Sequence, residues 1–212
     1  QRTATAQAQG FFTHEIIPVS IAQRKGDPIV VDTDEHPRAS TTLEGLAKLK
    51  PVVTAEGTVT AGNASGINDG AAAVLIASEQ AIEEYQLKPR AKIIASTAVG
   101  IEPRIMGFAP APAIKKLLKQ ANLTLEQIDV IELNEAFAAQ ALAVTRDLGL
   151  ADDSTQVNPN GGAIAIGHPL GASGARLVTT ALNQLEQTGG TYALCSMCIG
   201  VGQGIAMIIQ RV

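Results

Sequence analysis

The sequence predicts an α/β fold in which helices cover a mixed β-sheet. Hydrophobic residues make up 46% of the 212 residues and aromatic residues only 3%, and tryptophan is absent. A core built mainly from Ala, Val, Ile and Leu favours layered α/β packing over an aromatic-rich β-sandwich. From residue 89 onwards, strand-like runs alternate with helix-like segments, which is typical of a sheet with helices packed on it.

The first 88 residues contain less regular structure. Residues 1–9 predict a helix that ends at Gly10, since glycine is favoured just after a helix. Residues 15–21 predict a short strand, and the charged, turn-rich stretch 24–51 predicts a loop-dominated subdomain. The run AAAVLIAS at 71–78 has the continuous apolar character of a buried strand, and a short helix is expected directly after it.

The second part of the chain predicts four strands and three helices. Four apolar residues within 110–123 follow the i, i+3, i+4, i+7 spacing of a helix with one buried face. Asn134 and Gly149 mark the expected start and end of an alanine-rich helix. The expected strands are 90–100, 129–133, 191–196 and 204–212, and the expected helices are 110–123, 134–150 and 175–190.

Charge and composition exclude several classes of partner. The formal net charge is −4, and the Lys and Arg residues form no basic stripe, so no nucleic-acid partner is expected. No signal peptide or long apolar span is visible, so no membrane contact is expected. Two cysteines do not make a disulfide framework, and the cytoplasm is the expected location.

Three short segments place a reactive side chain at the boundary of an element. They are LNEAF at 133–137, NGGAIAIGHPLGASGAR at 160–176 and CIGVGQG at 198–204. Ends of strands and the turns that follow them are where α/β sheets carry their sites. His168 lies in a turn with five glycines nearby, where backbone and ligand can approach closely.

The pair Cys195 and Cys198 fits no metal or redox motif. Zinc would need two more ligands, and none of the three histidines has a suitably spaced partner. A redox C-x-x-C stands at the start of a helix, and a nucleotide loop needs a helix and a second strand after it. Two interpretations stay open, a thiol base or nucleophile beside backbone N–H groups, or two small buried hydrophobes.

Together these segments, with GTVTAGNASGINDGAAA at 57–73, resemble the thiolase family over essentially the whole chain. The resemblance implies half of a five-layer αβαβα sandwich together with part of a loop domain. It assigns residues 1–67 to a partial CoA-binding loop domain and 68–88 to the last strand and helix of an N-terminal domain. Residues 89–212 would form the C-terminal domain.

The resemblance also implies roles for individual residues. His168 would activate a nucleophilic cysteine and, with a water held by Asn134, line one oxyanion hole. Cys198 would move a proton to or from the acetyl α-carbon, and the backbone N–H of Gly200 would help to form a second oxyanion hole. The implied contacts to CoA and the acyl group are Ser65, Arg38, Met106 and Phe137.

The implied reaction is acyl transfer, namely cleavage of a 3-oxoacyl-CoA by CoA or the reverse condensation. Coenzyme A would be a co-substrate, without a permanent cofactor or metal. Thiolases form their acyl-enzyme on a cysteine of the N-terminal half, and neither Cys195 nor Cys198 has that context. We therefore expect a fragment that is inactive alone, needs its N-terminal half as partner, and forms a homodimer or homotetramer when complete.

RIMGFAPAPAI and ALCSMCIGVGQG most resemble the thiolases that cleave 3-oxoadipyl-CoA to succinyl-CoA and acetyl-CoA in the β-ketoadipate pathway of aromatic-compound degradation. The alternatives are an acetyl-CoA acetyltransferase acting on acetoacetyl-CoA and a longer-chain 3-ketoacyl-CoA thiolase of fatty acid β-oxidation. An alternative of another class is a non-catalytic thiolase-like module that binds CoA or lipid.

Overall fold

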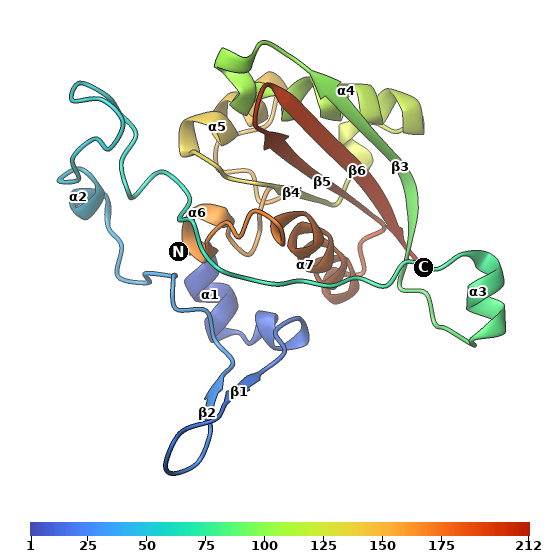
Figure 1. The fold of residues 1–212 in the computed structure, drawn as a ribbon. Coiled ribbons are helices and arrows are strands. Elements are labelled where there is room, and N and C mark those ends of the chain that lie inside the picture. Colours follow the sequence, from blue (N-terminus) through green and yellow to red (C-terminus); the bar gives the residue numbers. More distant parts are fainter.

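A four-stranded mixed sheet with helices on both faces forms the larger part of the fold (Figure 1), as the sequence predicts. The computed structural model describes residues 1–212. The strands are β1 Val19–Ile21, β2 Ile29–Val31, β3 Ala91–Gly100, β4 Val130–Leu133, β5 Tyr192–Ile199 and β6 Gln203–Arg211. The α-helices are α1 Arg2–Ala8, α2 Leu43–Leu46, α3 Glu79–Glu84, α4 Pro110–Ala121, α5 Ala138–Asp147, α6 Ala163–Ile166 and α7 Ser173–Thr188. Three 3₁₀ helices are η1 Phe11–His14, η2 Pro103–Phe108 and η3 Leu125–Gln127.

The strand order of the main sheet is β3-β6-β5-β4. β6 runs antiparallel to β3 and β5, and β4 runs parallel to β5 with Leu133 opposite Ser196. Two neighbouring parallel strands need a long crossover connection. Here that connection contains α5, α6 and α7, and it carries His168 between α6 and α7.

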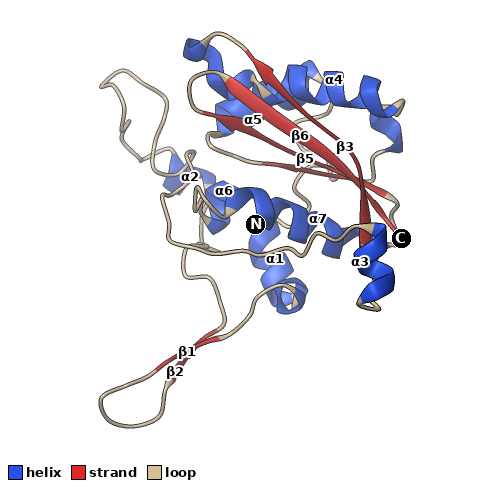
Figure 2. Ribbon diagram, turned by 45° about the vertical axis from the view of Figure 1, so that its right-hand side comes forward, coloured by secondary structure: helices blue, strands red, loops and turns tan.

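Each face of the sheet has its own apolar cluster. α4 and α5 cover one face, where Ile114 and Val144 pack against Ile131, and α7 covers the other, where Leu177 packs with Val130. Figure 2 shows α4 and α7 on opposite sides of the strands. Successive side chains of a strand point to opposite faces, so Val130 and Ile131 serve different clusters. None of the helices has the length and apolar character needed to cross a membrane.

The N-terminal helix α1 contacts the loop after α5 rather than the sheet. The Arg2 guanidinium donates to the Asp153 carbonyl (2.9 Å), and the Thr3 hydroxyl donates to the Asn160 carbonyl (3.2 Å). The left-handed φ of +72° at Gly10 ends this helical segment as predicted. Beyond it, the antiparallel hairpin β1–β2 projects away from the rest of the chain in Figure 1.

The strand predicted at 71–78 does not form in this chain. This stretch is irregular and pairs with no strand, and Leu75 and Ile76 are 82% and 73% exposed. An apolar run becomes a strand only where a neighbouring strand satisfies its backbone N–H and C=O groups, and no strand of the main sheet lies beside this one. The helix after it does form as α3, where the Ser78 hydroxyl caps the N–H of Ala81 (3.2 Å).

The alanine-rich helix starts later than its pattern predicts. α5 begins at Ala138, four residues after Asn134. The backbone N–H of Asn134 instead donates to the Ser196 carbonyl (2.9 Å), so Asn134 extends the pairing of β4 with β5. Gly149 ends the helix as predicted, with a left-handed φ of +77°.

Candidate functional site

Asn134 and Cys198 lie at the same edge of the sheet. Asn134 directly follows β4, and its N–H bonds to Ser196 of β5. Cys198 lies two residues further along β5, next to the end of that strand. Because β4 and β5 are parallel, their carboxyl ends meet at one edge, as the sequence analysis expects of an α/β site.

His168 occupies a tight turn between α6 and α7. Gly167 before it has a φ of +94°, and a Cβ there would collide with the side chain of Asn68. The backbone N–H of His168 donates to the Gly66 carbonyl (3.0 Å), and Pro169 follows. The turn is therefore fixed from outside by segment 66–68, far away in the sequence.

The hydrogen bonds of His168 indicate which ring nitrogen carries the proton and which is unprotonated. The Ser173 hydroxyl donates its proton to the Pro169 carbonyl (3.0 Å), so its oxygen accepts from the Nδ1–H of His168 (2.6 Å). In the neutral ring the other nitrogen is then an acceptor. This Nε2 lies 3.4 Å from the amide nitrogen of Asn134, so a basic nitrogen faces the Asn134 amide.

The surroundings of His168 also favour its neutral form. Burial lowers the pKa of His168 below its ordinary value, and the positive charge of Arg176 lowers it further. A neutral imidazole with an unprotonated Nε2 can take a proton from a thiol or a water, which is the role of a general base.

The side chain of Asn134 has an unused acceptor. Asn134 is fully buried, and its Oδ1 has no hydrogen-bond partner in the protein. Buried amide oxygens normally accept a hydrogen bond from protein or from ordered water. The arrangement is thus suited to hold a water or a substrate donor beside His168, while Nδ2 faces the ring.

Cys198 and Gly200 supply a thiol and a free backbone donor. Cys198 is buried, and burial raises the pKa of its thiol, with a smaller opposing effect from a backbone hydrogen bond. Gly200 begins the β5–β6 turn, and its N–H has no acceptor in the protein. Opposite Cys198 in β6, Gly204 lies so close to Ala109 that a Cβ would come within 2.6 Å of its backbone.

The two cysteines have different surroundings. Cys195 belongs to the apolar cluster beneath α7, and burial raises the pKa of its thiol far above the ordinary value. Because it lies three residues before Cys198 on one strand, the two side chains point to opposite faces. Of the two interpretations, packing fits Cys195, and no hydrogen bond links Cys198 to His168.

Two of the four expected CoA and acyl contacts come together. The Ser65 backbone N–H and hydroxyl both donate to the Ala136 carbonyl (3.0 and 3.3 Å), and Ala64 pairs with Phe137. Segment 63–70 therefore runs from the end of the NEAF motif to the His168 turn. It connects two motifs that the sequence keeps 30 residues apart.

Met106 and Arg38 lie elsewhere. Met106 is half-buried in η2, where the neighbouring Gly107 packs against Gln140 in the first turn of α5. Arg38 is exposed, and its guanidinium makes no ion pair or hydrogen bond. The structure does not bring it into contact with the other site residues.

A sequence model described as the thiolase C-terminal domain matches residues 87–211, and the thiolase N-terminal domain matches residues 1–80. The first match alone spans more than half of the chain. The chain belongs to the thiolase family.

Curated relatives of this thiolase chain match it from end to end. A β-ketoadipyl-CoA thiolase of Acinetobacter baylyi is 84% identical over 212 residues, all of this chain and 53% of the relative. The 3-oxoadipyl-CoA/3-oxo-5,6-dehydrosuberyl-CoA thiolase of Escherichia coli is 58% identical with the same coverage. The chain thus spans about half the length of the curated relatives it matches.

Solved thiolase structures share the fold. The acetyl-CoA acetyltransferase of Bacillus anthracis superposes with a TM-score of 0.94 at 43% identity, over all of this chain and 53% of that one. Human mitochondrial 3-ketoacyl-CoA thiolase in complex with CoA gives 0.89 at 44% identity, over all of this chain and 52% of that one. The thiolase-like fold inferred from the motifs is confirmed.

Some residues that surround the candidate site are not predicted from the sequence. Ser173 orients His168, Glu132 forms an ion pair with Arg176 (3.0 Å), and Asn158 bonds both the N–H and the carbonyl of Leu133 (2.8 Å each). Ser173 and Arg176 stand inside the quoted glycine-rich motif. Their position five and eight residues after the histidine, at the start of a helix, is the signal that could have found them.

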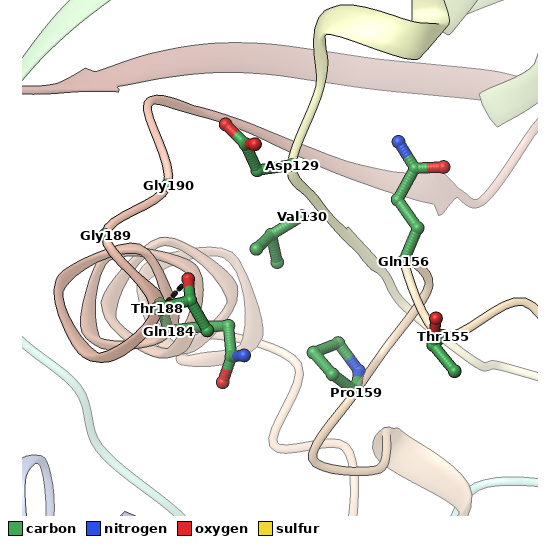
Figure 3. A pocket seen from close by; sticks show the side chains of 9 residues that line it. All are labelled: Asp129, Val130, Thr155, Gln156, Pro159, Gln184, Thr188, Gly189 and Gly190. Carbon is green, nitrogen blue, oxygen red and sulfur yellow. Dashed lines mark hydrogen bonds between the residues drawn. The ribbon is translucent and has the colours of Figure 1, made fainter.

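A cavity with no part in the candidate site lies at the other end of the sheet. It has a volume of about 420 Å³ and lies at the start of β4 and the end of α7, between Asp129, Gln184 and Gly189. Figure 3 shows its mostly polar lining. None of the candidate site residues contributes to it. The structure also contains no cluster of three or more His, Cys, Asp or Glu residues able to hold a metal ion.

Proposed function

We propose that this chain is the C-terminal part of a thiolase that cleaves 3-oxoadipyl-CoA with CoA to succinyl-CoA and acetyl-CoA. The observation that carries the proposal is the basic Nε2 of His168 facing the buried Asn134 amide (3.4 Å), at the sheet edge that carries Cys198. This is the machinery that proton transfer and oxyanion binding require.

The first half of the cycle is an acyl transfer to the enzyme. His168 takes the proton of a nucleophilic cysteine, which the N-terminal half would supply, and the thiolate attacks the 3-oxo carbon. The bond between C2 and C3 breaks, the acyl group stays on the cysteine, and acetyl-CoA leaves as its enolate. Cys198 protonates the α-carbon of that enolate, while the Asn134 water and His168 hold its oxygen.

The second half releases the product. The thiol of CoA loses its proton to the thiolate of Cys198 and attacks the acyl-enzyme, which forms a tetrahedral oxyanion. The backbone N–H of Gly200 helps to hold that oxyanion, because this donor has no acceptor within the protein. Collapse forms the shortened acyl-CoA and releases the nucleophilic cysteine as its thiolate, which takes back from His168 the proton removed in the first half.

The substrate assignment is supported by the sequence identities to relatives with different names. Relatives called β-ketoadipyl-CoA thiolase are 58–84% identical to this chain, whereas the acetyl-CoA acetyltransferase of Allochromatium vinosum is 52% identical. We therefore place 3-oxoadipyl-CoA before acetoacetyl-CoA and before longer 3-oxoacyl-CoA substrates of β-oxidation.

CoA is proposed as a co-substrate, without a permanent cofactor. The CoA-bound human relative supports a CoA site in this fold. We assign the pantetheine arm and acyl group to Ser65, Phe137 and Met106, and the nucleotide end to Arg38. The assembly proposed is a cytoplasmic homodimer or homotetramer in which residues 1–67 belong to the loop domain.

Steady-state kinetics of the complete protein test this function. The value of kcat/KM should be highest for 3-oxoadipyl-CoA when it is compared with acetoacetyl-CoA and a medium-chain 3-oxoacyl-CoA. The 212-residue chain alone should show no turnover. A preference for acetoacetyl-CoA would overturn the substrate assignment, and CoA-dependent cleavage by the chain alone would overturn the need for a second half.

A non-catalytic CoA-binding module would bind CoA without turnover in the complete protein. The paired His168 and Asn134 argue against it, because CoA binding alone does not require a base placed beside a buried amide. Isothermal titration of CoA beside the kinetic assay distinguishes the two.

A further inference from the structure

A buried ion pair lies directly behind the candidate site. Glu132 of β4 is fully buried, and its Oε2 accepts from Nη1 of Arg176 on α7 (3.0 Å). The side chain of Arg176 is only 18% exposed. None of the catalytic steps proposed above uses either residue.

The ion pair is connected to His168 and Asn134 at both ends, through α7 and through β4. Arg176 lies three residues after Ser173, about one helical turn, and Ser173 accepts the Nδ1–H of His168 (2.6 Å). His168 faces Asn134 (3.4 Å), and Asn134 lies two residues after Glu132 on the same face of the strand. Movement of α7 relative to β4 would therefore change the geometry of the His168–Asn134 pair.

Stability alone does not explain this pair. Burial raises the pKa of Glu132 to about 7, although the charge of Arg176 acts in the opposite direction. Both partners also keep a buried atom without a hydrogen bond, Oε1 of Glu132 and Nη2 of Arg176. Buried ion pairs often contribute little to stability against apolar replacements. A role in positioning His168 would account for a buried ion pair that stability alone does not explain.

Arg176 is the positive charge that acts on His168, and carboxylates surround it. Glu15, which accepts from Thr180 and Asn183 of α7, and Asp34 both feel the charge of Arg176. Glu135 is held by Asn158 and by the N–H of Ile164. The titratable and charged groups facing this region from the packed elements are Glu15, Asp34, His36, Glu132, Glu135, Cys195 and Arg176.

We propose that Arg176 and Glu132 are positioning residues for His168, with the ion pair fixing the first turns of α7 to β4 and holding the Arg176 guanidinium on the helix turn that also carries Ser173, the hydrogen-bond partner of His168. The inference rests on the proposed function, because it assigns His168 the role of base. It adds two residues that touch neither substrate nor the reacting atoms.

The test compares three variants of the complete protein. Arg176→Gln removes the charge, Arg176→Lys keeps the charge but not the planar fork, and Glu132→Gln keeps the shape without the carboxylate. Arg146→Gln is the matched control, because Arg146 forms an exposed ion pair with Asp152 (2.6 Å). The readouts are kcat, KM for CoA, the acidic limb of kcat/KM against pH, and the His168 imidazole titration by NMR.

Arg176→Gln should lower kcat about tenfold or more through misplacement of the base, with KM for CoA within about twofold. It should also move the His168 titration and the acidic limb to higher pH, since a nearby positive charge is lost. Arg176→Lys should restore the titration but only part of kcat. Glu132→Gln should lower kcat without moving the acidic limb of kcat/KM to higher pH. Arg146→Gln should have the kcat, KM and pH profile of the wild type.

An unshifted His168 titration in Arg176→Gln, or wild-type kcat in Glu132→Gln, would overturn the proposal. If Arg176→Gln does not fold, Arg176→Lys and Glu132→Gln still decide it. Failure of the proposed function is distinguishable, because a wild-type protein without thiolytic turnover would refute that function. The His168 titration would still report the effect of Arg176.

Discussion

Replacement of Ser173 by alanine tests the orientation of the base. The Ser173 oxygen accepts the Nδ1–H of His168 at 2.6 Å, and its hydroxyl donates to the Pro169 carbonyl at 3.0 Å. Without this oxygen the imidazole N–H loses its partner in a site where Ser173 is only 1% exposed. Leaving a buried polar group unsatisfied costs about 1–3 kcal/mol. Because the imidazole carries its second proton in the transition state, we assign this cost to the transition state, where it lowers kcat about fivefold to about 150-fold.

The assay is kcat for thiolysis by the complete protein, with circular dichroism to confirm the fold. Thr179→Ala is the matched control, because the Thr179 hydroxyl also bonds back to a carbonyl four residues earlier (Ala175, 3.0 Å) but touches no histidine. The reasoning predicts that Ser173→Ala loses kcat within that range and that Thr179→Ala does not. Equal rates for the two variants would refute it.

Three further substitutions test other parts of the structure. Asn134→Ala should lower kcat at least about tenfold in steady-state assays, because it removes the amide that faces His168. Gly202→Ala should lower the free energy of unfolding by more than about 1 kcal/mol in urea titrations, since Gly202 has a φ of +85° and a Cβ would collide with the Ile101 carbonyl. Glu132→Gln should change the pH dependence of stability. The folded-state pKa of Glu132 is raised from 4.5 to about 7, so its stabilising contribution is complete below about pH 4.5 and lost as pH rises through about 7. Wild type should therefore lose stability relative to Glu132→Gln as pH rises from about 4 to about 8. Wild-type rates for Asn134→Ala, an unchanged unfolding midpoint for Gly202→Ala, or parallel pH curves for wild type and Glu132→Gln would each contradict the corresponding expectation.

Local patterns predict most of the sheet and its helices. The helical spacing within 110–123 corresponds to α4, and the apolar runs at 129–133 and 191–196 correspond to β4 and β5. These elements are predictable because their apolar faces pack within the chain itself, as the burial of Ile114 and Leu194 shows. The run at 71–78 has equal apolar character but no strand of this chain beside it, so its backbone has no partner with which to form a strand here.

The sequence predicts the reactive residues of the candidate site but not the residues that orient them. Asn134, His168 and Cys198 each lie at the predicted end of a secondary-structure element. The signal is the end of an apolar run for Asn134 and neighbouring glycines for the other two. The tautomer of His168 depends on Ser173 and Pro169, and its surroundings depend on Arg176 across the layer between β4 and α7. Such relations appear only when segments distant in sequence are placed together.

Exchange of the methyl protons of acetyl-CoA with D₂O, followed by NMR, tests the acid/base role of Cys198 most directly. In the complete protein the wild type should catalyse this exchange, and Cys198→Ala should lose it. Cys195→Ala should retain the exchange, because its thiol lies in the apolar cluster beneath α7 on the opposite face of β5. Exchange by Cys198→Ala at the wild-type rate would contradict the proposed site.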